Sequence, residues 1–301
     1  MNFLKAMNRE QREEHAKKNP AVLERMEREG WSSARYTQRV LNKEAKEAKK
    51  NVEYTVKKDD LHIFQGDIMT GLADKIPSCS INACITDMPY NRRSFHLASA
   101  LGALCKRTLV DNGVLLVMAG TNTIPEVTQR LGEHLRYWWH LVMTNNQGGG
   151  GANLQFKRIT PQYKSILMYV NGDKYDGFWV SDLLDGGKVD PESTGYHPHG
   201  QQRHNFSTLI DLFSVAGDTI LDPFAGGGTT AEACVYTPNK HRKIYTYDIE
   251  PKYVQITKER VLRRLGWCIH TLDKPTTQAT NDYACLDCRA CLSNKTTLML
   301  P

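Results

Sequence analysis

A carboxylate, a proline and an aromatic ring follow one another where an apolar segment of the sequence ends. The segment INACIT runs directly into Asp87, Met88, Pro89 and Tyr90. Pro89 has no N–H and restricts Met88 to an extended backbone, so the Met88 carbonyl is free to accept a hydrogen bond. A carboxylate and a carbonyl that face one spot, beside an aromatic ring, suit an exocyclic amino group on a flat ring. An ordinary turn is the alternative explanation, because Asp and Pro are both common in turns.

A second group of residues surrounds three consecutive glycines. The segment DTILDPFAGGGTTAEACV is interpreted as a strand ending at Asp222, a turn containing Gly226 and Gly228, and a helix that opens at Thr229 or Thr230. Glycines allow a ligand to approach the backbone closely, and the start of a helix offers free N–H groups. The next strand, RKIYTYDIEP, ends on Asp248 about twenty residues later, where doubly wound folds bind ribose hydroxyls.

The spacing of these glycines narrows the class of ligand. The sequence contains neither G-x-x-x-x-G-K-[ST] nor, at this turn, G-x-G-x-x-G, so it indicates neither a nucleoside triphosphate nor a dinucleotide. An adenosine-containing ligand without phosphates fits best. The steric needs of a strand-to-helix turn are the alternative explanation for the glycines.

Taken together, D-x-P-Y and the downstream D-P-F-x-G-x-G-T-T resemble the amino-methyltransferases of DNA. These enzymes transfer a methyl group from S-adenosyl-L-methionine to adenine N6 or cytosine N4. The order of the two motifs is similar to the circularly permuted β group of that family, and the resemblance covers residues 60–265. Two features depart from the family: Met88 stands where proline or a small residue is usual, and little chain is left for a target-recognition region.

The resemblance also implies roles for individual residues. Asp67 would reach the adenine of the cofactor, and the segment HPHGQ would lie at the cofactor's amino acid end. The implied catalytic residues are Asp87, Met88, Pro89 and Tyr90. The implied cofactor-binding residues are Asp67, His199, Gly200, Gln201, Asp222, Phe224, Gly226, Gly228, Thr229 and Asp248. No metal is implied at this site.

The function implied by the resemblance is adenine-specific: methyl transfer to adenine N6 in double-stranded DNA after base flipping. Asp87 favours adenine, because Ser more often takes its place in cytosine N4 enzymes. Cytosine N4 transfer, a non-catalytic DNA-binding or regulatory protein with the same fold, and an RNA substrate stay open. The expected phosphate contacts, with solvated surface as the alternative, are Arg92, Arg93, Lys157 and Arg158.

Alternating strands and helices must position these residues. The candidate strands are LHIF, NACIT, GVLLVM, YWWHLVM, SILMYV and, further on, 218–222 and 243–248. The candidate helices are SFHLASALGALCKRTL, TIPEVTQRLGEHL and residues 206–215, 229–236 and 252–265. This alternation predicts an α/β fold with a doubly wound, mainly parallel sheet and helices on both faces. With the resemblance, the prediction becomes a Rossmann-like methyltransferase fold with permuted motif order.

Composition divides the chain into three expected parts. Residues 1–55 form a basic helical arm, since thirteen Lys or Arg stand against eight Glu in residues 1–50. Residues 56–268 form the methyltransferase domain, with small target-recognition loops at about 145–160 and 185–205, and residues 269–301 form a flexible tail. The arm is a solvated hairpin packed on the body, a nucleic-acid contact or a contact within a homodimer.

The cysteines and the apolar runs bear on the cellular setting. Cys285, Cys288 and Cys291 in the tail are either reduced and flexible or part of a metal site that Cys268 or His270 would complete, since zinc normally takes four ligands. No apolar run is long enough to cross a membrane, and the N-terminus lacks the pattern of a signal peptide. We therefore expect a cytoplasmic, nucleoid-associated protein of a bacterial or phage-infected cell, without a membrane partner.

Overall fold

The computed structural model describes residues 48, 51–70, 72, 75–89, 94–144, 158–159, 161–187, 195–197 and 200–267. Nearly all of them belong to the compact unit that begins at Glu53. The predicted tail, nearly all of the predicted arm and large parts of the two predicted recognition loops lie outside the described residues. No helix in the described part of the chain is long and apolar enough to cross a membrane.

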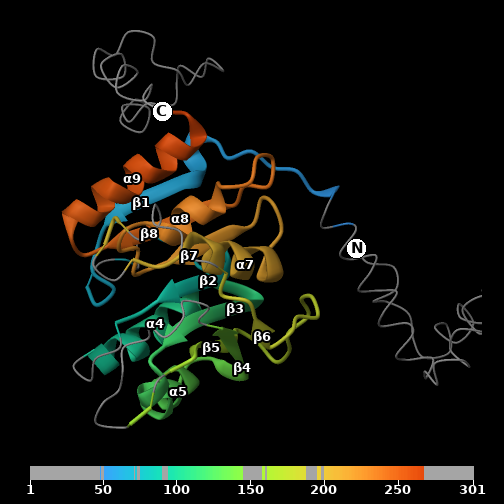
Figure 1. Cartoon of the computed structure of the whole chain (residues 1–301), viewed down its shortest axis with the longest axis vertical. Helices are drawn as coiled ribbons and strands as arrows, with labels where there is room; N and C mark the ends of the chain where they lie inside the picture. The colour runs from blue at the N-terminus through green and yellow to red at the C-terminus, as the bar shows by residue number, and fades with distance from the viewer. Residues whose placement is uncertain are drawn as a thin grey trace, which may run out of the picture. The chain divides into compact units, whose positions relative to one another are not determined.

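A single sheet of eight strands runs through the described residues of this unit (Figure 1). The strands are β1 Leu61–Gln65, β2 Ile81–Asp87, β3 Leu109–Ala119, β4 Arg136–Thr144, β5 Tyr163–Val170, β6 Leu183–Leu184, β7 Thr219–Asp222 and β8 Lys243–Asp248. Their spatial order is β1-β8-β7-β2-β3-β5-β4-β6. Strand β5 is antiparallel to its neighbours β3 and β4, and the other neighbouring pairs are parallel.

The expected mainly parallel sheet is confirmed, and all seven predicted strands are present. Long apolar runs made these strands recognisable, because a strand covered on both faces is apolar nearly throughout. In β2, for example, the four residues from Ala83 to Thr86 are all buried. Strand β6 was not predicted, since two leucines in a polar, glycine-containing segment give no periodicity.

Helices cover both faces of the sheet. Helices α4 Phe95–Thr108 and α5 Ile124–Gly132 share one core with strand residues such as Cys84 and Leu115. Helices α7 Arg203–Phe213, α8 Thr229–Cys234 and α9 Pro251–Leu265 share the other core with residues such as Ile85 and Ile166. We call these the α4 face and the α7 face of the sheet.

The parallel strands bring the predicted motifs to one edge. Strands β8, β7 and β2 are neighbours and end on Asp248, Asp222 and Asp87. Because β5 runs the opposite way, its first residues rather than its last lie at this edge. The register shows this directly, since Asp87 pairs with Met118 of β3, and Met118 pairs with Ile166 near the start of β5. We call this edge the catalytic edge, because Asp87, which was predicted to be catalytic, lies there.

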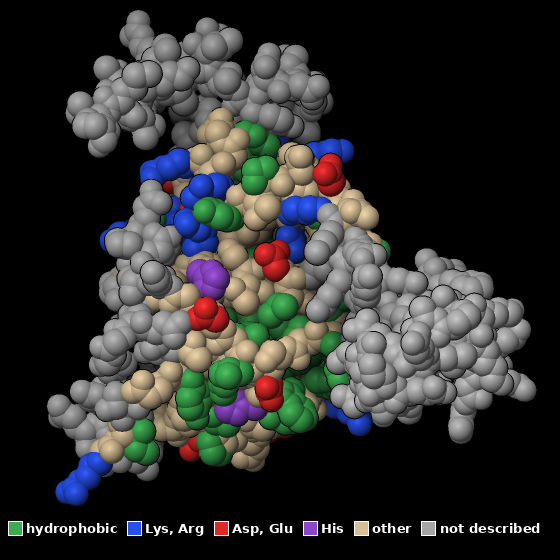
Figure 2. Space-filling view, turned by 45° about the vertical axis from the view of Figure 1, so that its right-hand side comes forward, with side chains coloured by type: hydrophobic (Ala, Val, Ile, Leu, Met, Phe, Trp, Pro, Cys, Tyr) green, Lys and Arg blue, Asp and Glu red, His purple; other side chains and the backbone are tan. Residues whose placement is uncertain are grey.

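Hydrophobic and basic side chains gather in different parts of one face of the molecule. In Figure 2, hydrophobic side chains gather toward the bottom of the face shown, and Lys and Arg gather nearer the top. The large exposed hydrophobic residues of β4, β6 and the segment before β6 include Tyr137, Trp139, Trp179 and Leu183.

Candidate active site

The end of β2 sends two consecutive side chains to opposite faces of the sheet. Asp87 alternates with Ile85 and therefore projects on the α7 face. The next side chain, Met88, is only 2% exposed and packs in the core of the α4 face with Ala98 and Leu101. The Met88 side chain thus fills the core, and only the backbone of this residue is left for the catalytic edge. Pro89 follows it and is exposed.

The surroundings of Asp87 raise its pKa, so that part of the population is still protonated near neutral pH. Burial raises the pKa of Asp87 to about 7, and the neighbouring Asp222 carboxylate also raises it. The Lys164 ammonium group and a hydrogen bond from the Gln201 side chain act in the opposite direction. A strongly shifted carboxylate at a strand end is a frequent feature of catalytic sites.

Lys164 is a residue of this site that sequence reasoning missed. It is the second residue of β5, and its Nζ donates a hydrogen bond to the Oε1 atom of Gln201. Burial lowers the pKa of Lys164, and the Asp87 carboxylate counteracts this effect. The available signal was a lysine inside an otherwise apolar strand, YKSILMYV, where a buried charge requires a partner.

The buried Asp222 carboxylate holds the start of the glycine turn through hydrogen bonds. It is 3% exposed, and its Oδ1 accepts hydrogen bonds from Thr86 Oγ1 at 2.6 Å and from the Phe224 N–H at 3.1 Å. Burial raises the pKa of this carboxyl group, and hydrogen bonds from Thr230, Thr86 and Phe224 oppose the rise. Asp222 was predicted to bind the cofactor. In the structure its carboxylate joins β7 to β2 and holds the start of the turn.

The glycine turn requires glycine at its last position. Gly228 has a φ of +78°, and a Cβ added there would lie 2.6–2.9 Å from atoms of Thr257 in α9. Gly226 has a φ of +47°, and its N–H donates to Asp248 Oδ2 at 2.8 Å. The other oxygen of Asp248 accepts the Glu250 N–H at 2.9 Å. Asp248 therefore ties the turn to the end of β8.

Asp67 lies next to Asp248 at the same edge. It follows β1, which pairs with β8, and the Gly66 N–H donates to the Asp248 carbonyl at 3.0 Å. The Asp67 Oδ1 accepts the Met69 N–H at 2.9 Å, which fixes a local turn. Asp67 and Asp248 thus lie in neighbouring segments at the ends of β1 and β8, where both were predicted to contact the adenosine part of the cofactor.

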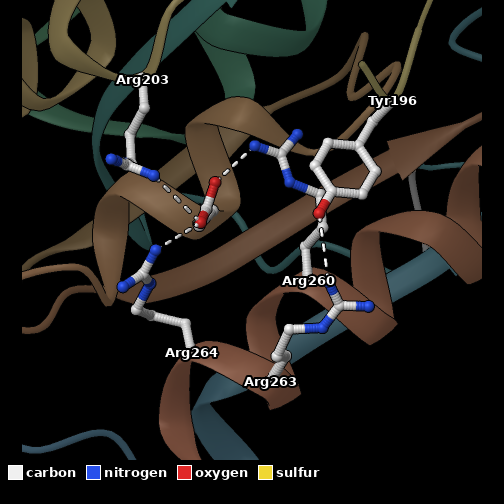
Figure 3. Close-up of a pocket in the computed structure, with 6 residues that line it drawn as sticks. Tyr196, Arg203, Arg260, Arg263 and Arg264 are labelled. Atoms are coloured by element: carbon white, nitrogen blue, oxygen red, sulfur yellow. Dashed lines mark hydrogen bonds and ion pairs between the residues drawn. The ribbon is translucent and has the colours of Figure 1, made fainter. Parts of the chain in front are cut away.

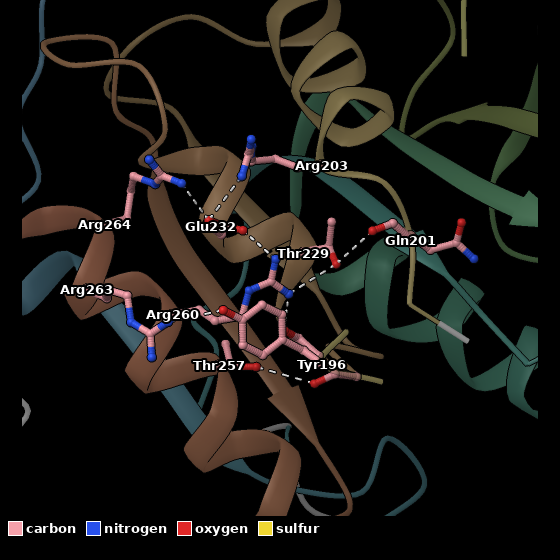
Figure 4. Close-up of polar contacts among 11 residues, drawn as sticks. Tyr196, Gln201, Arg203, Thr229, Glu232, Thr257, Arg260, Arg263 and Arg264 are labelled. Atoms are coloured by element: carbon pink, nitrogen blue, oxygen red, sulfur yellow. Dashed lines mark hydrogen bonds and ion pairs between the residues drawn. The ribbon is translucent and has the colours of Figure 1, made fainter. Parts of the chain in front are cut away.

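The segment before α7 reaches the start of α8. The Thr229 Oγ1 donates to the Gln201 carbonyl at 3.4 Å (Figure 4). The Gly200 N–H donates to the His197 carbonyl at 2.8 Å. Gln201, which was predicted to bind the cofactor, thereby contacts the helix that follows the glycine turn, and its side chain contacts Asp87. It connects the two motifs that the sequence placed far apart.

An arginine cluster lies behind the glycine turn. Glu232 of α8 has a side chain only 9% exposed and forms ion pairs with Arg203 at 3.4 Å, with Arg264 at 3.0 Å and with Arg260. Arg260 also donates to the Gly227 carbonyl, which makes it a direct support of the turn. A cavity of about 230 Å³ lies among these residues, with Tyr196 and Arg263 on its wall (Figure 3). Sequence reasoning did not find this cluster.

Several predicted site residues are not part of the described structure. Tyr90, Arg92, Arg93, Lys157 and His199 lie outside the described residues. Arg158, the remaining predicted DNA contact, has an exposed side chain. Within the described ranges, no group of three or more His, Cys, Asp or Glu is arranged to hold a metal ion. The three cysteines of the tail lie outside those ranges.

Known proteins share this arrangement. Residues 81–259 match the model of the N6_N4_Mtase family, described as DNA methylase. The type II methyltransferase M2.DpnII of Streptococcus pneumoniae is 25% identical over 174 residues, which are 52% of this chain and 63% of the relative. This chain thus spans less than two thirds of the length of that relative.

Solved structures show the same fold. The crystal structure of the M1.HpyAVI–SAM complex is 22% identical, with a TM-score of 0.54 over 67% of this chain and 98% of the other. The cytosine-N4-specific PvuII DNA methyltransferase is 13% identical, with a TM-score of 0.57 over 71% of this chain and 92% of the other. These likenesses confirm the predicted methyltransferase fold. Because the family model matches more than half of the sequence, the chain belongs to the N6_N4_Mtase family of DNA methylases.

Proposed function

We propose that the protein methylates the N6 amino group of adenine in double-stranded DNA, with S-adenosyl-L-methionine as the methyl donor. The carrying observation is the position of Asp87, which lies at the catalytic edge next to the glycine turn with a pKa of about 7. Membership of the family supports DNA as the substrate and S-adenosyl-L-methionine as the cofactor.

The cofactor would be held by residues from four neighbouring segments. Asp67 and Asp248 would accept hydrogen bonds from the adenosine, and the glycine turn would allow its close approach. The segment ending at Gln201 would bind the amino acid end, because it contacts Thr229 at the start of α8. When bound, the cofactor supplies an activated methyl group on a positively charged sulfur.

The residues of the β2 end would act on the amino group. The Asp87 carboxylate and the Met88 carbonyl accept its two N–H bonds, which draws electron density toward the nitrogen. As the new N–C bond forms and the S–C bond breaks, the nitrogen loses a proton, and ionised Asp87 accepts it. Tyr90 is proposed as the platform on which the flipped base stacks.

The choice of adenine over cytosine rests on Asp87. The sequence resemblance associates Asp at this position with adenine N6 enzymes and Ser with cytosine N4 enzymes. Both bases present an exocyclic amino group, so the same geometry would serve either. Adenine is the proposed target, and N4-methylcytosine is the product that would correct this choice.

The test is incubation of unmethylated duplex DNA and of RNA with the labelled cofactor, followed by nucleoside analysis. We expect N6-methyladenine from DNA only. The Asp87→Ala variant should bind the cofactor as wild type does and lose at least about 100-fold in turnover, because it lacks the proton acceptor. Wild-type turnover in this variant would refute the role of Asp87. DNA binding without any methylated product from the wild-type protein would favour the non-catalytic alternative.

A further inference from the structure

The proposed reaction does not use Lys164, a lysine that lies at the catalytic edge. Lys164 alternates with Ile166 along β5, and Asp87 alternates with Ile85 along β2. Ile85 and Ile166 both belong to the core of the α7 face. Lys164 and Asp87 therefore project on the same face of the sheet, with only β3 between their strands.

The Gln201 side chain links Lys164 to Asp87. Its amide oxygen accepts a hydrogen bond from the Lys164 Nζ, and its side chain also hydrogen-bonds the Asp87 carboxylate. A neutral amide has a carbonyl on one side and N–H donors on the other, so it can connect an ammonium group to a carboxylate. The backbone of Gln201 contacts Thr229, which ties the linkage to α8.

Charges of opposite sign act on Asp87 from two other strands of the sheet. Within the described structure, the charged groups that act on Asp87 are the Asp222 carboxylate from β7 and the Lys164 ammonium from β5. Asp222 is almost fully buried, so its effect is little screened by water. Two carboxylates close together in a partly dry site do not both ionise readily unless a cation is near.

We propose that Lys164 is a positioning residue of the active site: its ammonium group, linked through Gln201, holds the Asp87 carboxylate in the ionised form that accepts hydrogen bonds. This inference rests on the proposed function, because it assigns a cause to the charge of the catalytic carboxylate. Lys164 touches neither the base nor the methyl donor in this assignment.

The direction of the effect follows from the charges. Lys164 lowers the pKa of Asp87, whereas burial and Asp222 raise it. Removal of the ammonium group should therefore raise the pKa of Asp87 above its value of about 7. At neutral pH more of the Asp87 side chain would then be a neutral acid, which is a weaker hydrogen-bond acceptor than a carboxylate and takes up no further proton.

The experiment compares the pH dependence of turnover in three variants with saturating cofactor and DNA. Turnover should fall on the acid side of the pH profile, and we call this part of the profile the acid limb. In Lys164→Met, the acid limb should move up by one pH unit or more, so turnover at a pH below the limb should be about tenfold lower than in wild type. At high pH the turnover should approach that of wild type. Lys164→Arg keeps the charge and should restore the wild-type limb. Lys174→Met removes an exposed lysine that follows the same strand, and it should change nothing.

Two outcomes would overturn the inference. An unshifted acid limb in Lys164→Met would show that Lys164 does not set the charge of Asp87, and an equal loss at every pH would assign Lys164 another role. If Lys164→Met does not fold, Lys164→Gln takes its place, because its amide still hydrogen-bonds Gln201 without a charge. An NMR titration of the Asp87 carboxyl in wild type and in Lys164→Gln needs no turnover. It therefore tests this inference even if the proposed function fails.

Discussion

At the scale of one residue, the proposed chemistry depends on the charge of the Asp87 carboxylate. An ordinary Asp is fully ionised at neutral pH and is a weak proton acceptor. Burial raises the pKa of Asp87 to about 7, so in the proposed reaction it would take up and release a proton near neutral pH. General acid–base catalysis is most effective when the pKa of the group lies near the operating pH.

This shift predicts a specific pH dependence. Only ionised Asp87 accepts the amino hydrogens, so kcat/KM should rise with pH, level off above the Asp87 pKa of about 7, and fall about tenfold per unit below it. Steady-state rates between about pH 5.5 and about pH 9 would measure this limb. Asp87→Asn retains a hydrogen-bond acceptor without a titrating group, so its residual activity should lack the limb. The same limb in Asp87→Asn would assign the titration to another group.

Some site residues were visible in the sequence and others were not. Asp87 and Asp248 follow apolar strands, and strand ends in a parallel sheet meet at one edge, so local pattern sufficed. Lys164 and Arg260 acquire their roles from partners 37 and 28 residues away, which no local pattern specifies. Their signal was only a charge in a segment that had to be buried.

At the scale of elements, the glycine turn depends on three neighbours. Strand β7 delivers its start through Asp222, β8 contacts it through Asp248, and α9 packs against its last glycine through Thr257. Because the Gly228 position is crowded and has positive φ, the turn tolerates no side chain there.

Gly228→Ala should therefore damage both stability and cofactor binding. We expect the free energy of unfolding to fall by about 2 kcal/mol or more, because the new Cβ adds strain in a left-handed backbone and meets Thr257. Denaturant unfolding and calorimetric titration with S-adenosyl-L-methionine would measure the two effects. Gly132→Ala is the matched control, since no atom lies within 4 Å of its added Cβ. Unchanged cofactor affinity in Gly228→Ala would separate the turn from the cofactor site.

Arg260 supports the same turn from α9. Replacing it by Met removes the donor to the Gly227 carbonyl and one of the ion pairs of buried Glu232. We expect a loss of about 3 kcal/mol or more in the free energy of unfolding, together with a raised KM for the cofactor.

A second arginine provides the comparison. Arg264 pairs with the same carboxylate but its side chain is 33% exposed, so Arg264→Met should cost only about 1 kcal/mol. Equal losses in the two variants would show that contact with the turn adds nothing to the Arg260 ion pair.

The elements themselves were predictable to different degrees. Strands with long apolar runs and helices with regularly spaced apolar residues were predicted correctly. Burial of one or two faces of an element requires apolar residues at a regular spacing, and this spacing is visible in the sequence. Helix α8 ends at Cys234, two residues before its predicted end, where the Val235 N–H bonds the Glu232 carbonyl in a tighter turn. Such an end depends on local hydrogen-bond geometry, which composition does not encode.

At the scale of the whole molecule, positive charge is concentrated in one part of the chain. Residues 1–50 carry a net charge of +5, of a total of +6. The chain divides after Val52 into two compact units, and the site described above belongs to the second. The unit that would bind the cofactor is therefore nearly neutral, while a DNA substrate requires positive charge.

Removal of residues 1–52 tests what the arm contributes. We expect cofactor affinity to be unchanged, because its proposed site lies in the second unit, and duplex affinity at low salt to fall about tenfold with a shallower salt dependence. Fluorescence anisotropy at several salt concentrations would measure this, with sedimentation to record the oligomeric state. An unchanged salt dependence would exclude a phosphate contact by the arm, and a change from dimer to monomer would assign it to a homodimer.

The fold class could be predicted from the sequence, but the target could not. Alternation of strands and helices was sufficient to predict the sheet, and the order of two motifs was sufficient to predict the family. The target base is selected by contacts between a flipped nucleotide and several segments at once, so residue types at separate positions do not define it. The role proposed for Asp87 narrows the expected chemistry to an amino group, and the choice between two bases requires analysis of the product.

The antiparallel direction of β5 has a consequence for how this enzyme could vary. Asp87, Asp222 and Asp248 lie at strand ends that continue into loops of the proposed site, so changing one of them would disturb the loop that follows it. Lys164 instead sits inside a ladder, paired with Met143 of β4, with six further residues of β5 after it. If the proposed function holds, a change of charge at this position would move the pH range of activity without altering the glycine turn. A single substitution at Lys164 would then be enough to adapt the activity to acidic or alkaline surroundings.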